Sequence, residues 1–276
     1  MSQFLRVAAV QLNSQDDVPA NLAECCSLIG RAAEQGAQLV LLPENFAFMG
    51  DETERRRLAE RLGDLNAPIQ SALSAAAAEH RVTLVAGGFP ELSADEARPY
   101  NTLLVIHPDG SLGTSYRKIH LFDVDLPDGT RLCESASTEP GQRPQVAEVA
   151  GFKLGLSICY DLRFPELYRA LVDLGAEVLL VPAAFTLHTG KDHWHVLLRA
   201  RAIEAQSWVV AAAQWGRHPR GRASYGHAMV VDPWGVVVAE CSDGVGVVCA
   251  NIDRSLLGRV RLALPALSHR RLDLEK

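Results

Sequence analysis

The sequence predicts an α/β fold with mixed sheets, and three features of its patterning support that prediction. Apolar runs of strand length recur along the whole chain. They alternate with stretches in which apolar residues follow the helical period, as expected when buried strands are joined by helical crossovers. Toward the C-terminus, some strands are separated only by short turns such as residues 232–235 (DPWG). Such turns favour antiparallel hairpins, so a mixed sheet fits better than a purely parallel one.

The expected elements follow from these patterns in chain order. Strands are predicted at residues 6–12, 38–43, 82–87, 101–106, 153–158, 177–182, 208–213, 227–232 and 245–252. Helices are predicted at about residues 19–36, 66–80, 163–174 and 192–206. No linker rich in Pro or Ser divides the chain, so we expect one domain over residues 1–276.

Two segments of the chain resemble each other. Residues 36–45 (GAQLVLLPEN) and 175–184 (GAEVLLVPAA) both run from Gly-Ala through an apolar strand to a Pro at its carboxyl end. Such a sequence pattern is common in α/β proteins, so chance explains the similarity as well as duplication does. If duplication is the origin, the chain contains two similar layered halves.

Composition limits the class of protein. With 276 residues, 48% of them hydrophobic, the chain can bury a large core. Its 27 Lys and Arg against 33 Asp and Glu give a formal net charge of -6, so a nucleic-acid or anionic-membrane partner is not expected. Residues 1–15 lack the pattern of a secretory leader, and no apolar run approaches the length of a membrane span. We therefore expect a soluble, cytoplasmic protein.

The cysteines give no sign of a disulfide framework. Neither a CxxC pair nor zinc-ligand spacing occurs among the six, which are Cys25, Cys26, Cys133, Cys159, Cys241 and Cys249. A structural metal is therefore not expected either. Most of these thiols are predicted to be small buried hydrophobes.

Three polar residues stand at or near strand ends, where α/β folds gather catalytic groups. Glu44 follows an apolar strand, and burial there would raise its pKa, as suits a general base near neutral pH. Cys159 lies between a strand and the helix that Pro165 is expected to begin. Backbone N–H groups at such a place can lower a thiol pKa and hold an oxyanion. Lys118 enters an apolar stretch, where a cation is costly unless it is paired or used.

Taken singly, each of these residues also has a structural explanation. Glu44 suits an exposed strand end, Cys159 suits a core position, and Lys118 suits a surface position beside Arg117. Together, a carboxylate, a thiol and an ammonium would form a hydrolytic site. Their separation in sequence does not show that they meet.

Three segments around these residues resemble, in chain order, the glutamate, lysine and cysteine signatures of the nitrilase superfamily of carbon-nitrogen hydrolases. They are residues 41–46 (LLPENF), 116–123 (YRKIHLFD) and 157–166 (SICYDLRFPE), and the similarity extends over nearly the whole chain. The resemblance implies a four-layer α-β-β-α sandwich. It also implies a homo-oligomer, a dimer or larger, that acts on a small-molecule amide.

The resemblance further implies the roles of the site residues. Glu44, Lys118 and Cys159 match the family's base, lysine and nucleophile, and Glu134 matches a second glutamate that positions the lysine or assists the base. Glu44 would take the thiol proton, and the thiolate would attack the amide carbonyl. Lys118 and the backbone N–H of Tyr160 would stabilise the oxyanion, a contribution of about 2.7–4 kcal/mol per donor in comparable sites. Water would then hydrolyse the thioester, with no metal or organic cofactor.

Substrate preference depends on more variable segments. Residues 211–218 and 222–235 resemble those of superfamily amidases that act on glutathione whose amino group has become a keto group. Amidases for α-ketoglutaramate share the sequence around Lys118, so that motif does not separate the two substrates, and the first segment favours the glutathione derivative. Departures from the family pattern occur at Trp215 and at residues 186–194 (TLHTGKDHW). If these line the pocket, they affect the substrate prediction but not the catalytic set.

Two residues are candidates for substrate binding, Arg163 and Thr186. Arg163 is placed to hold a substrate carboxylate through a bidentate pair, and an ion pair with Glu166 or another buried acid is an equal alternative. His193 and His195 invite a metal-site interpretation. Alternate residues on a helix point apart, however, so packing is expected instead and no metal site is predicted.

Two other classes of protein fit parts of the pattern. An isochorismatase-like thiol hydrolase also combines Cys, Lys and an acid, but its acid is expected as Asp near the first strand. Asp16 and Asp17 lie past that strand in a polar loop. A non-catalytic scaffold would have no need to retain Glu44, Lys118 and Cys159 together.

Overall fold

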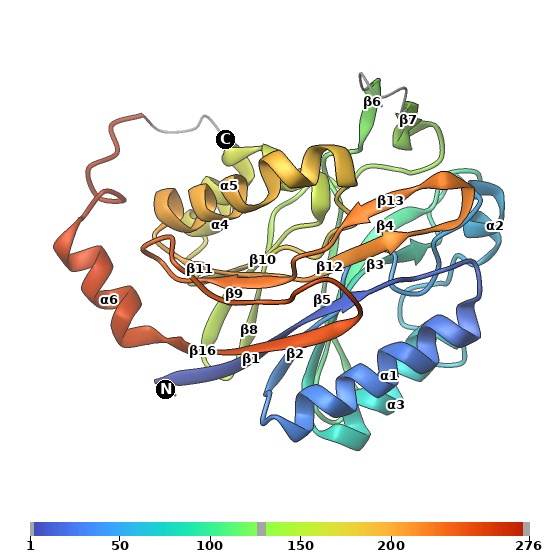
Figure 1. Ribbon diagram of the computed structural model, residues 1–276, viewed down its shortest axis with the longest axis horizontal. Coiled ribbons are helices and arrows are strands. Elements are labelled where there is room, and N and C mark those ends of the chain that lie inside the picture. The colour runs from blue at the N-terminus through green and yellow to red at the C-terminus, as the bar shows by residue number, and fades with distance from the viewer. Residues whose placement is uncertain (1–2, 126–130, 273–276) are drawn as a thin grey trace.

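The structure is a computed structural model that describes residues 3–125 and 131–272. Two β-sheets stack face to face, and helices cover both outer faces (Figure 1). This is the α-β-β-α sandwich with mixed sheets that the sequence resemblance implied, so the predicted fold class is confirmed. Within the described residues, no helix is both long enough and apolar enough to cross a membrane.

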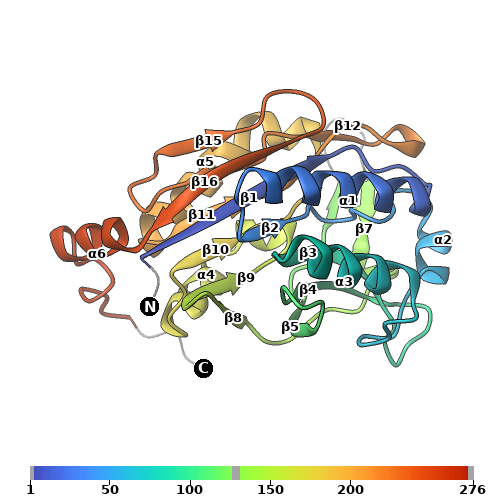
Figure 2. The same ribbon diagram turned by 90° about the horizontal axis from the view of Figure 1, so that it is seen from below.

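The first sheet has eight strands and is covered by α1 (Val18–Glu34) and α3 (Pro68–His80), as Figure 2 shows. Its spatial order is β13 (Ala223–Tyr225), β12 (Ala213–Arg217), β1 (Phe4–Leu12), β2 (Leu39–Leu41), β3 (Thr83–Glu91), β4 (Tyr100–Ile106) and β5 (Leu112–Arg117), with β16 (Gly246–Asp253) also paired to β1. Strands β1, β2 and β3 are parallel, and α1 and α3 supply the crossovers that parallel neighbours require. β4 and β5 continue the sheet antiparallel.

The second sheet has six strands and is covered by α4 (Pro165–Asp173) and α5 (Leu187–Ala205). Its order is β15 (Val237–Glu240), β14 (Met229–Val231), β11 (Trp208–Ala211), β10 (Val178–Leu180), β9 (Phe152–Leu156) and β8 (Gln145–Val149). The central β9, β10 and β11 are parallel, β8 and β14 are antiparallel to them, and β15 is antiparallel to β14. The remaining elements are the β6 (Asp123–Asp125) and β7 (Arg131–Cys133) pair, α2 (Glu52–Arg57), α6 (Arg254–Ala263), and three short 3-10 helices, η1 (Glu134–Ala136), η2 (Cys159–Arg163) and η3 (Pro219–Gly221).

Two apolar layers explain why the central strands are almost entirely hydrophobic. Val7 and Leu41 pack with Leu180 in the layer between the two sheets. Val10 faces the other way and packs with Leu28 of α1. Because successive strand residues point to opposite faces, a strand covered on both sides needs apolar residues throughout.

The two similar sequence segments occupy equivalent places in the two sheets. β2 and β10 are both short central strands with parallel partners on each side. Each follows a helix and a glycine with positive φ, +81° at Gly36 and +93° at Gly175. Their carboxyl ends meet across the sandwich at Gly87, where a Cβ atom would lie 2.1 Å from Pro182 Cβ and 2.5 Å from Leu42 O. A glycine is therefore required where the residues after both strands converge.

All nine predicted strands and all four predicted helices are present, with shifted ends. Helix α5 starts at Leu187, several residues before the predicted start, because the Thr186 hydroxyl caps it by accepting the Thr189 N–H. The short edge elements were not predicted. β6, β7 and β15 are largely exposed, so they lack the continuous apolar runs that identified the buried strands.

Candidate active site

The four predicted catalytic side chains come from different elements and gather at one end of the sandwich. Glu44 follows β2, Lys118 follows β5, Glu134 begins η1, and Cys159 follows β9 and begins η2. Glu44, Lys118 and Cys159 are only 4%, 2% and 7% exposed. The structure therefore brings together residues separated by up to 115 positions, 159 minus 44.

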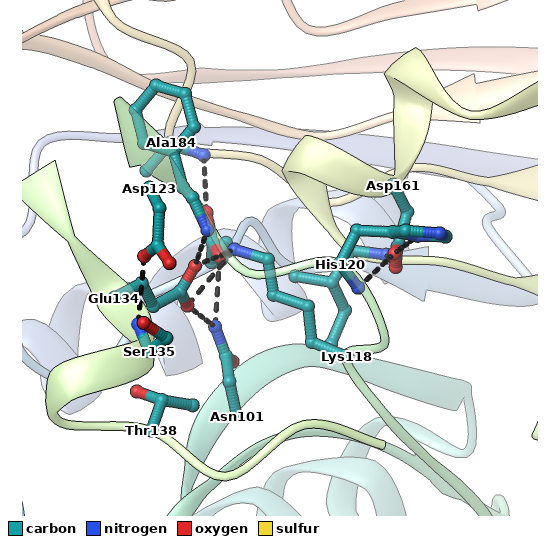
Figure 3. Close-up of polar contacts among 12 residues, drawn as sticks. Asn101, Lys118, His120, Asp123, Glu134, Ser135, Thr138, Asp161 and Ala184 are labelled. Atoms are coloured by element: carbon teal, nitrogen blue, oxygen red, sulfur yellow. Dashed lines mark hydrogen bonds and ion pairs between the residues drawn. The ribbon is translucent and has the colours of Figure 1, made fainter. Parts of the chain in front are cut away.

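Lys118 links the two glutamates. Its Nζ lies 2.9 Å from Glu44 Oε1, 2.8 Å from Glu134 Oε2 and 3.1 Å from Glu134 Oε1. Figure 3 shows Lys118 reaching the Glu134 carboxylate, with Asn101 beside it. Backbone N–H groups complete the set, because Ala184 donates to Glu44 Oε2 at 3.1 Å and Phe122 donates to Glu134 Oε2 at 2.7 Å. These bonds compensate charges that would otherwise be costly to bury.

The buried charges set the protonation states of the pair. Burial raises the pKa of Glu44, but the charge of Lys118 and its hydrogen bond outweigh burial, so the pKa lies below its usual range. Burial lowers the pKa of Lys118, but the charges of Glu134 and Glu44 raise it well above its usual range. The expectation of a raised Glu44 pKa was wrong, because it considered desolvation without the ammonium. The resting site holds a carboxylate and an ammonium.

Cys159 lies on a tight, strained turn beside Glu44. Its backbone has φ +48°, in the left-handed region that residues other than glycine rarely adopt. Its N–H donates to Pro182 O at 2.9 Å, which fixes the turn against the segment after β10. Burial, and then the charge of Glu44, raise the pKa of the thiol well above its usual range. The expected lowering by backbone N–H groups was therefore wrong, and the resting group is a neutral thiol that needs a base.

Asn101 belongs to the site although the sequence did not identify it. It lies on β4, is 1% exposed, and donates from Nδ2 to Glu44 Oε1 at 2.9 Å and to Glu134 Oε1 at 3.3 Å. Its Oδ1 is buried without a hydrogen-bond partner among the described residues. The Asn101 amide therefore bridges the carboxylates of Glu44 and Glu134. The only sequence signal was a polar residue at the start of an otherwise apolar strand.

Asp161 is a second residue that sequence reasoning missed. This fully buried carboxylate accepts the Tyr116 hydroxyl at 2.7 Å, the Ile158 N–H at 2.9 Å and the His120 N–H at 3.0 Å. Its Oδ1 also lies 2.7 Å from His120 Nδ1. Figure 3 shows the Asp161 and His120 side chains side by side. Asp161 therefore fastens the chain around Lys118 to the turn that carries the thiol.

A small cavity opens onto Cys159. Its empty space is about 200 Å³, part of it open to solvent, and it is lined by Phe122, Cys159, Tyr160, Arg163, Ala184, Phe185, Thr186 and Thr189. A larger hollow of about 1100 Å³ lies between α4 and residues 266–270 and contains none of the predicted catalytic residues. The smaller cavity is therefore the candidate substrate site, because it contains the predicted nucleophile.

Both predicted substrate-binding residues lie in this cavity. Arg163 is about half buried, its Nη1 lies 3.2 Å from His193 Nδ1, and its guanidinium lies 4.9 Å from the centroid of the Phe185 ring. No described carboxylate forms an ion pair with it, so the alternative pair with Glu166 is not formed. Burial lowers the pKa of Arg163. Thr186 lines the wall, with its hydroxyl 2.8 Å from Thr189 Oγ1.

The segment used to choose between substrates has a different role. Gln214 is fully buried, and its Nε2 donates to Glu44 O at 3.0 Å and to Ser14 Oγ at 2.8 Å. Ser14 O in turn lies 2.9 Å from His218 Nδ1. These residues hold the backbone of Glu44, and neither they nor Trp215 line the cavity. Tyr160, the predicted oxyanion donor, directly follows the thiol, and its ring lies 4.9 Å from that of Phe122.

A buried thiol, a carboxylate and an ammonium beside one cavity are the groups that a cysteine-dependent acyl-transfer hydrolase needs. A family profile described as carbon-nitrogen hydrolase matches residues 6–262, and the chain belongs to that family. The protein is accordingly an amidase, a hydrolase of carbon-nitrogen bonds.

Three known proteins illustrate the similarity. The chain is 49% identical over 266 residues to the deaminated glutathione amidase of Synechocystis sp., which covers 95% of this chain and 97% of that one. The crystal structure of the C. elegans NitFhit protein has a TM-score of 0.91 and 42% identity, covering 98% of this chain and 66% of that chain. A variant of the amidase from Nesterenkonia sp. AN1, with acrylamide added to its active-site cysteine, has a TM-score of 0.78 and 28% identity. The match covers 95% of this chain and 98% of that chain.

Proposed function

We propose that this amidase hydrolyses deaminated glutathione, in which a keto group replaces the amino group of glutathione, as a metabolite-repair reaction. Arg163 is the observation that carries the proposal. It is a half-buried guanidinium beside Cys159 that forms no ion pair with a described carboxylate. The keto-acid carboxylate of the substrate supplies that partner, because a guanidinium fork matches a carboxylate bidentately. The similarity to the Synechocystis enzyme supports the same substrate.

This anchoring determines which bond is attacked. With the keto-acid carboxylate at Arg163, the short carbon chain of the substrate directs its far carboxamide carbonyl toward Cys159. The nitrogen that leaves is then the amino group of cysteinylglycine rather than ammonia. The cavity is small, with about 200 Å³ of empty space that is partly open to solvent, so we expect the cysteinylglycine part to extend into solvent.

The proposed chemistry follows from the charge states. Glu44, ionised beside Lys118, accepts the proton of the neutral Cys159 thiol as the sulfur attacks the carbonyl. The Lys118 ammonium and the N–H of Tyr160 stabilise the developing oxyanion. Glu44 returns the proton to the departing nitrogen, which leaves a thioester on Cys159. Glu44 then activates the water that hydrolyses this thioester, while Glu134 holds Lys118 in place.

α-Ketoglutaramate is the second candidate substrate, and the small size of the cavity favours it. It carries the same keto-acid carboxylate and the same far carboxamide, but it has no cysteinylglycine tail. Hydrolysis of either compound forms α-ketoglutarate, so one assay measures both. We expect a higher kcat/KM for deaminated glutathione. A clear preference for α-ketoglutaramate overturns the specific assignment, and failure to cleave either compound contradicts keto-acid amidase function.

Arg163→Met tests the anchoring directly. Loss of a bidentate, charge-assisted pair is worth roughly 1.5–3 kcal/mol, which lowers kcat/KM for the keto-acid amides about 10- to 100-fold. Hydrolysis of an amide that lacks a carboxylate should be unchanged. Arg169→Met, on the exposed side of α4, serves as the control. Equal losses for charged and uncharged amides would show that Arg163 acts on the fold rather than on the substrate.

We also propose that the protein is a homodimer or larger oligomer. Val196 and Ile203, seven residues apart on one face of α5, are 64% and 49% exposed. Trp234, in the turn after β14, is 58% exposed, and the neighbouring Gly235 approaches Ile203. Such a cluster of exposed apolar side chains is typical of an interface. Light scattering should give a dimer mass or more, and Val196→Glu should lower it; a monomeric wild type contradicts the proposal.

The cytoplasm is the compartment we propose. All six cysteines are free in the structure, including the Cys159 thiol on which the mechanism depends. A reducing environment preserves such thiols. Fractionation of the source cells should place the protein in the soluble cytoplasmic fraction, and recovery from an oxidising compartment contradicts this proposal.

A further inference from the structure

A second group of chemically capable side chains lies away from Cys159. His195 Nε2 and His227 Nδ1 each lie 2.8 Å from Glu240 Oε1. His195 belongs to α5, His227 precedes β14, and Glu240 ends β15, an edge strand that Figure 2 shows near α5. The three potential ligand atoms lie within 4.8 Å of one another, the one such group of three or more found among the described residues.

The pairing of His195 differs from what the sequence suggested. The sequence predicted that His193 and His195 do not bind one ion together. In the structure, His193 contacts Arg163 and His195 contacts Glu240. The partner histidine instead comes from His227, on a separate element. The sequence therefore gave no spacing signal for this group, whose members are far apart along the chain.

The chemistry of the three side chains suits a divalent transition metal. Two imidazole nitrogens and one carboxylate oxygen are common zinc ligands, and His₂Glu sets with an open fourth position are known for this ion. The side chains of His195, His227 and Glu240 are 33%, 26% and 32% exposed, so an ion can enter and retain water. Metal binding requires each ring to present an unprotonated nitrogen, with its proton on the other nitrogen.

The surroundings fix the rings in place before any ion binds. His227 has φ +61°, and its carbonyl accepts the Trp194 Nε1–H at 2.9 Å. The Tyr225 ring lies 4.4 Å from that of His227 and 6.0 Å from that of His195. A strained backbone held by a buried indole is costly unless it serves a purpose. Rings positioned in advance lose less entropy on binding a metal.

We propose that His195, His227 and Glu240 form a binding site for one divalent transition-metal ion such as Zn²⁺. The ion joins α5 to the loop before β14 and to the end of β15. The Tyr225 N–H in that region donates to Phe185 O at 2.9 Å, and Phe185 lines the substrate cavity. Bound metal therefore stiffens the wall of the cavity and raises the melting temperature, without taking part in the chemistry of Cys159.

The test is metal titration of the full chain after chelator treatment and desalting, with Zn²⁺ by calorimetry and Co²⁺ by absorption. We expect saturable binding of one ion per chain and a higher Tm. His195→Ala and Glu240→Gln should each weaken binding at least about tenfold, since loss of even an outer partner costs 10- to 100-fold. His269→Ala, which removes an exposed histidine elsewhere, should leave binding unchanged.

A metal ion could instead bind to cysteine thiolates, and the absorption spectrum of bound Co²⁺ distinguishes the two kinds of site. Binding to imidazole and carboxylate gives no thiolate charge-transfer absorption, whereas binding to Cys159 or Cys133 does. The proposal is overturned if no saturable binding occurs, or if His195→Ala and Glu240→Gln bind as wild type does. Strong charge-transfer absorption that disappears in Cys159→Ala or Cys133→Ala assigns the ion to thiols and also overturns it.

Discussion

Lys118 Nζ lies 2.9 Å from Glu44 Oε1, and both side chains are almost completely buried. The same ammonium also contacts Glu134, so one positive charge serves two carboxylates. Such a group is stable as a set, because each charge compensates the cost of burying the others. The protonation states, the pH dependence and the effects of substitution all follow from this relationship.

Removing the ammonium should destabilise the fold. Lys118→Met leaves two carboxylates facing each other in the interior, and breaking a buried pair in this way costs about 3–5 kcal/mol. Urea unfolding should detect the loss at neutral pH. Lys191→Met removes an exposed ammonium paired with Asp192 and should change stability little. Equal stability of Lys118→Met and wild type would contradict the buried ion set.

Activity should depend on pH mainly at the acid end. The pKa of Glu44 lies below its ordinary 4.5, and that of Lys118 lies well above its ordinary 10.5. Neither group changes charge near neutral pH, so kcat/KM should fall only below about pH 4.5 on account of Glu44. An acid limb for Glu44 centred near neutral pH would contradict this charge assignment.

The lowered pKa of Glu44 also makes the stability of the fold depend on pH. Because the Glu44 pKa is lower in the folded protein than in the unfolded chain, its stabilising contribution is complete above the unfolded value. That contribution is lost as the pH falls through the lower folded value. Urea unfolding between pH 7 and pH 3 should therefore show a progressive loss of stability, which is smaller in Glu44→Gln.

Glu44→Gln should keep the shape of the site while removing its base. The amide oxygen can still accept the hydrogen bond from Lys118, but the amide NH2 cannot accept the Ala184 N–H, and the side chain cannot take the proton of Cys159. General-base catalysis contributes about 10²- to 10⁴-fold, so kcat should fall by at least about a hundredfold. Near-normal turnover would reassign proton transfer to Glu134.

Asn101 should act by positioning the two glutamates. Asn101→Leu removes the donor shared by Glu44 and Glu134, and leaving such groups unsatisfied costs about 1–3 kcal/mol. We expect kcat to fall while KM stays nearly constant, because Asn101 does not line the cavity. Asn251→Leu, on the exposed edge of β16, should alter neither constant. A change in KM alone would show that Asn101 contacts substrate instead.

Much of the fold could be predicted because its central strands are covered on both faces. A strand such as β2 or β10 must be apolar throughout, and that signal is visible without a structure. β15 and β7 give no such signal, because half or more of their residues remain accessible to water. Short edge strands are defined by their neighbours rather than by their own sequence.

The catalytic candidates were predictable for a different reason. The segments around Glu44, Lys118 and Cys159 carry a family resemblance, whereas Asn101 and Asp161 act through contacts that only the fold creates. Asn101 reaches Glu44 over 57 positions, and Asp161 reaches Tyr116 over 45. The direction of the Glu44 pKa was missed because the effect of the Lys118 ammonium was not counted. The direction of the Cys159 pKa was missed because burial and the charge of Glu44 were not counted.

The central claim is that Cys159 carries the acyl group, and turnover of two cysteine variants tests it most directly. Cys159→Ala should fold with a Tm near that of wild type and form no α-ketoglutarate from deaminated glutathione or α-ketoglutaramate. Cys133→Ala removes the exposed thiol next to Glu134 and should retain full turnover. Measurable hydrolysis by purified Cys159→Ala protein would contradict the account, and its absence, with Cys133→Ala active, is the result we predict.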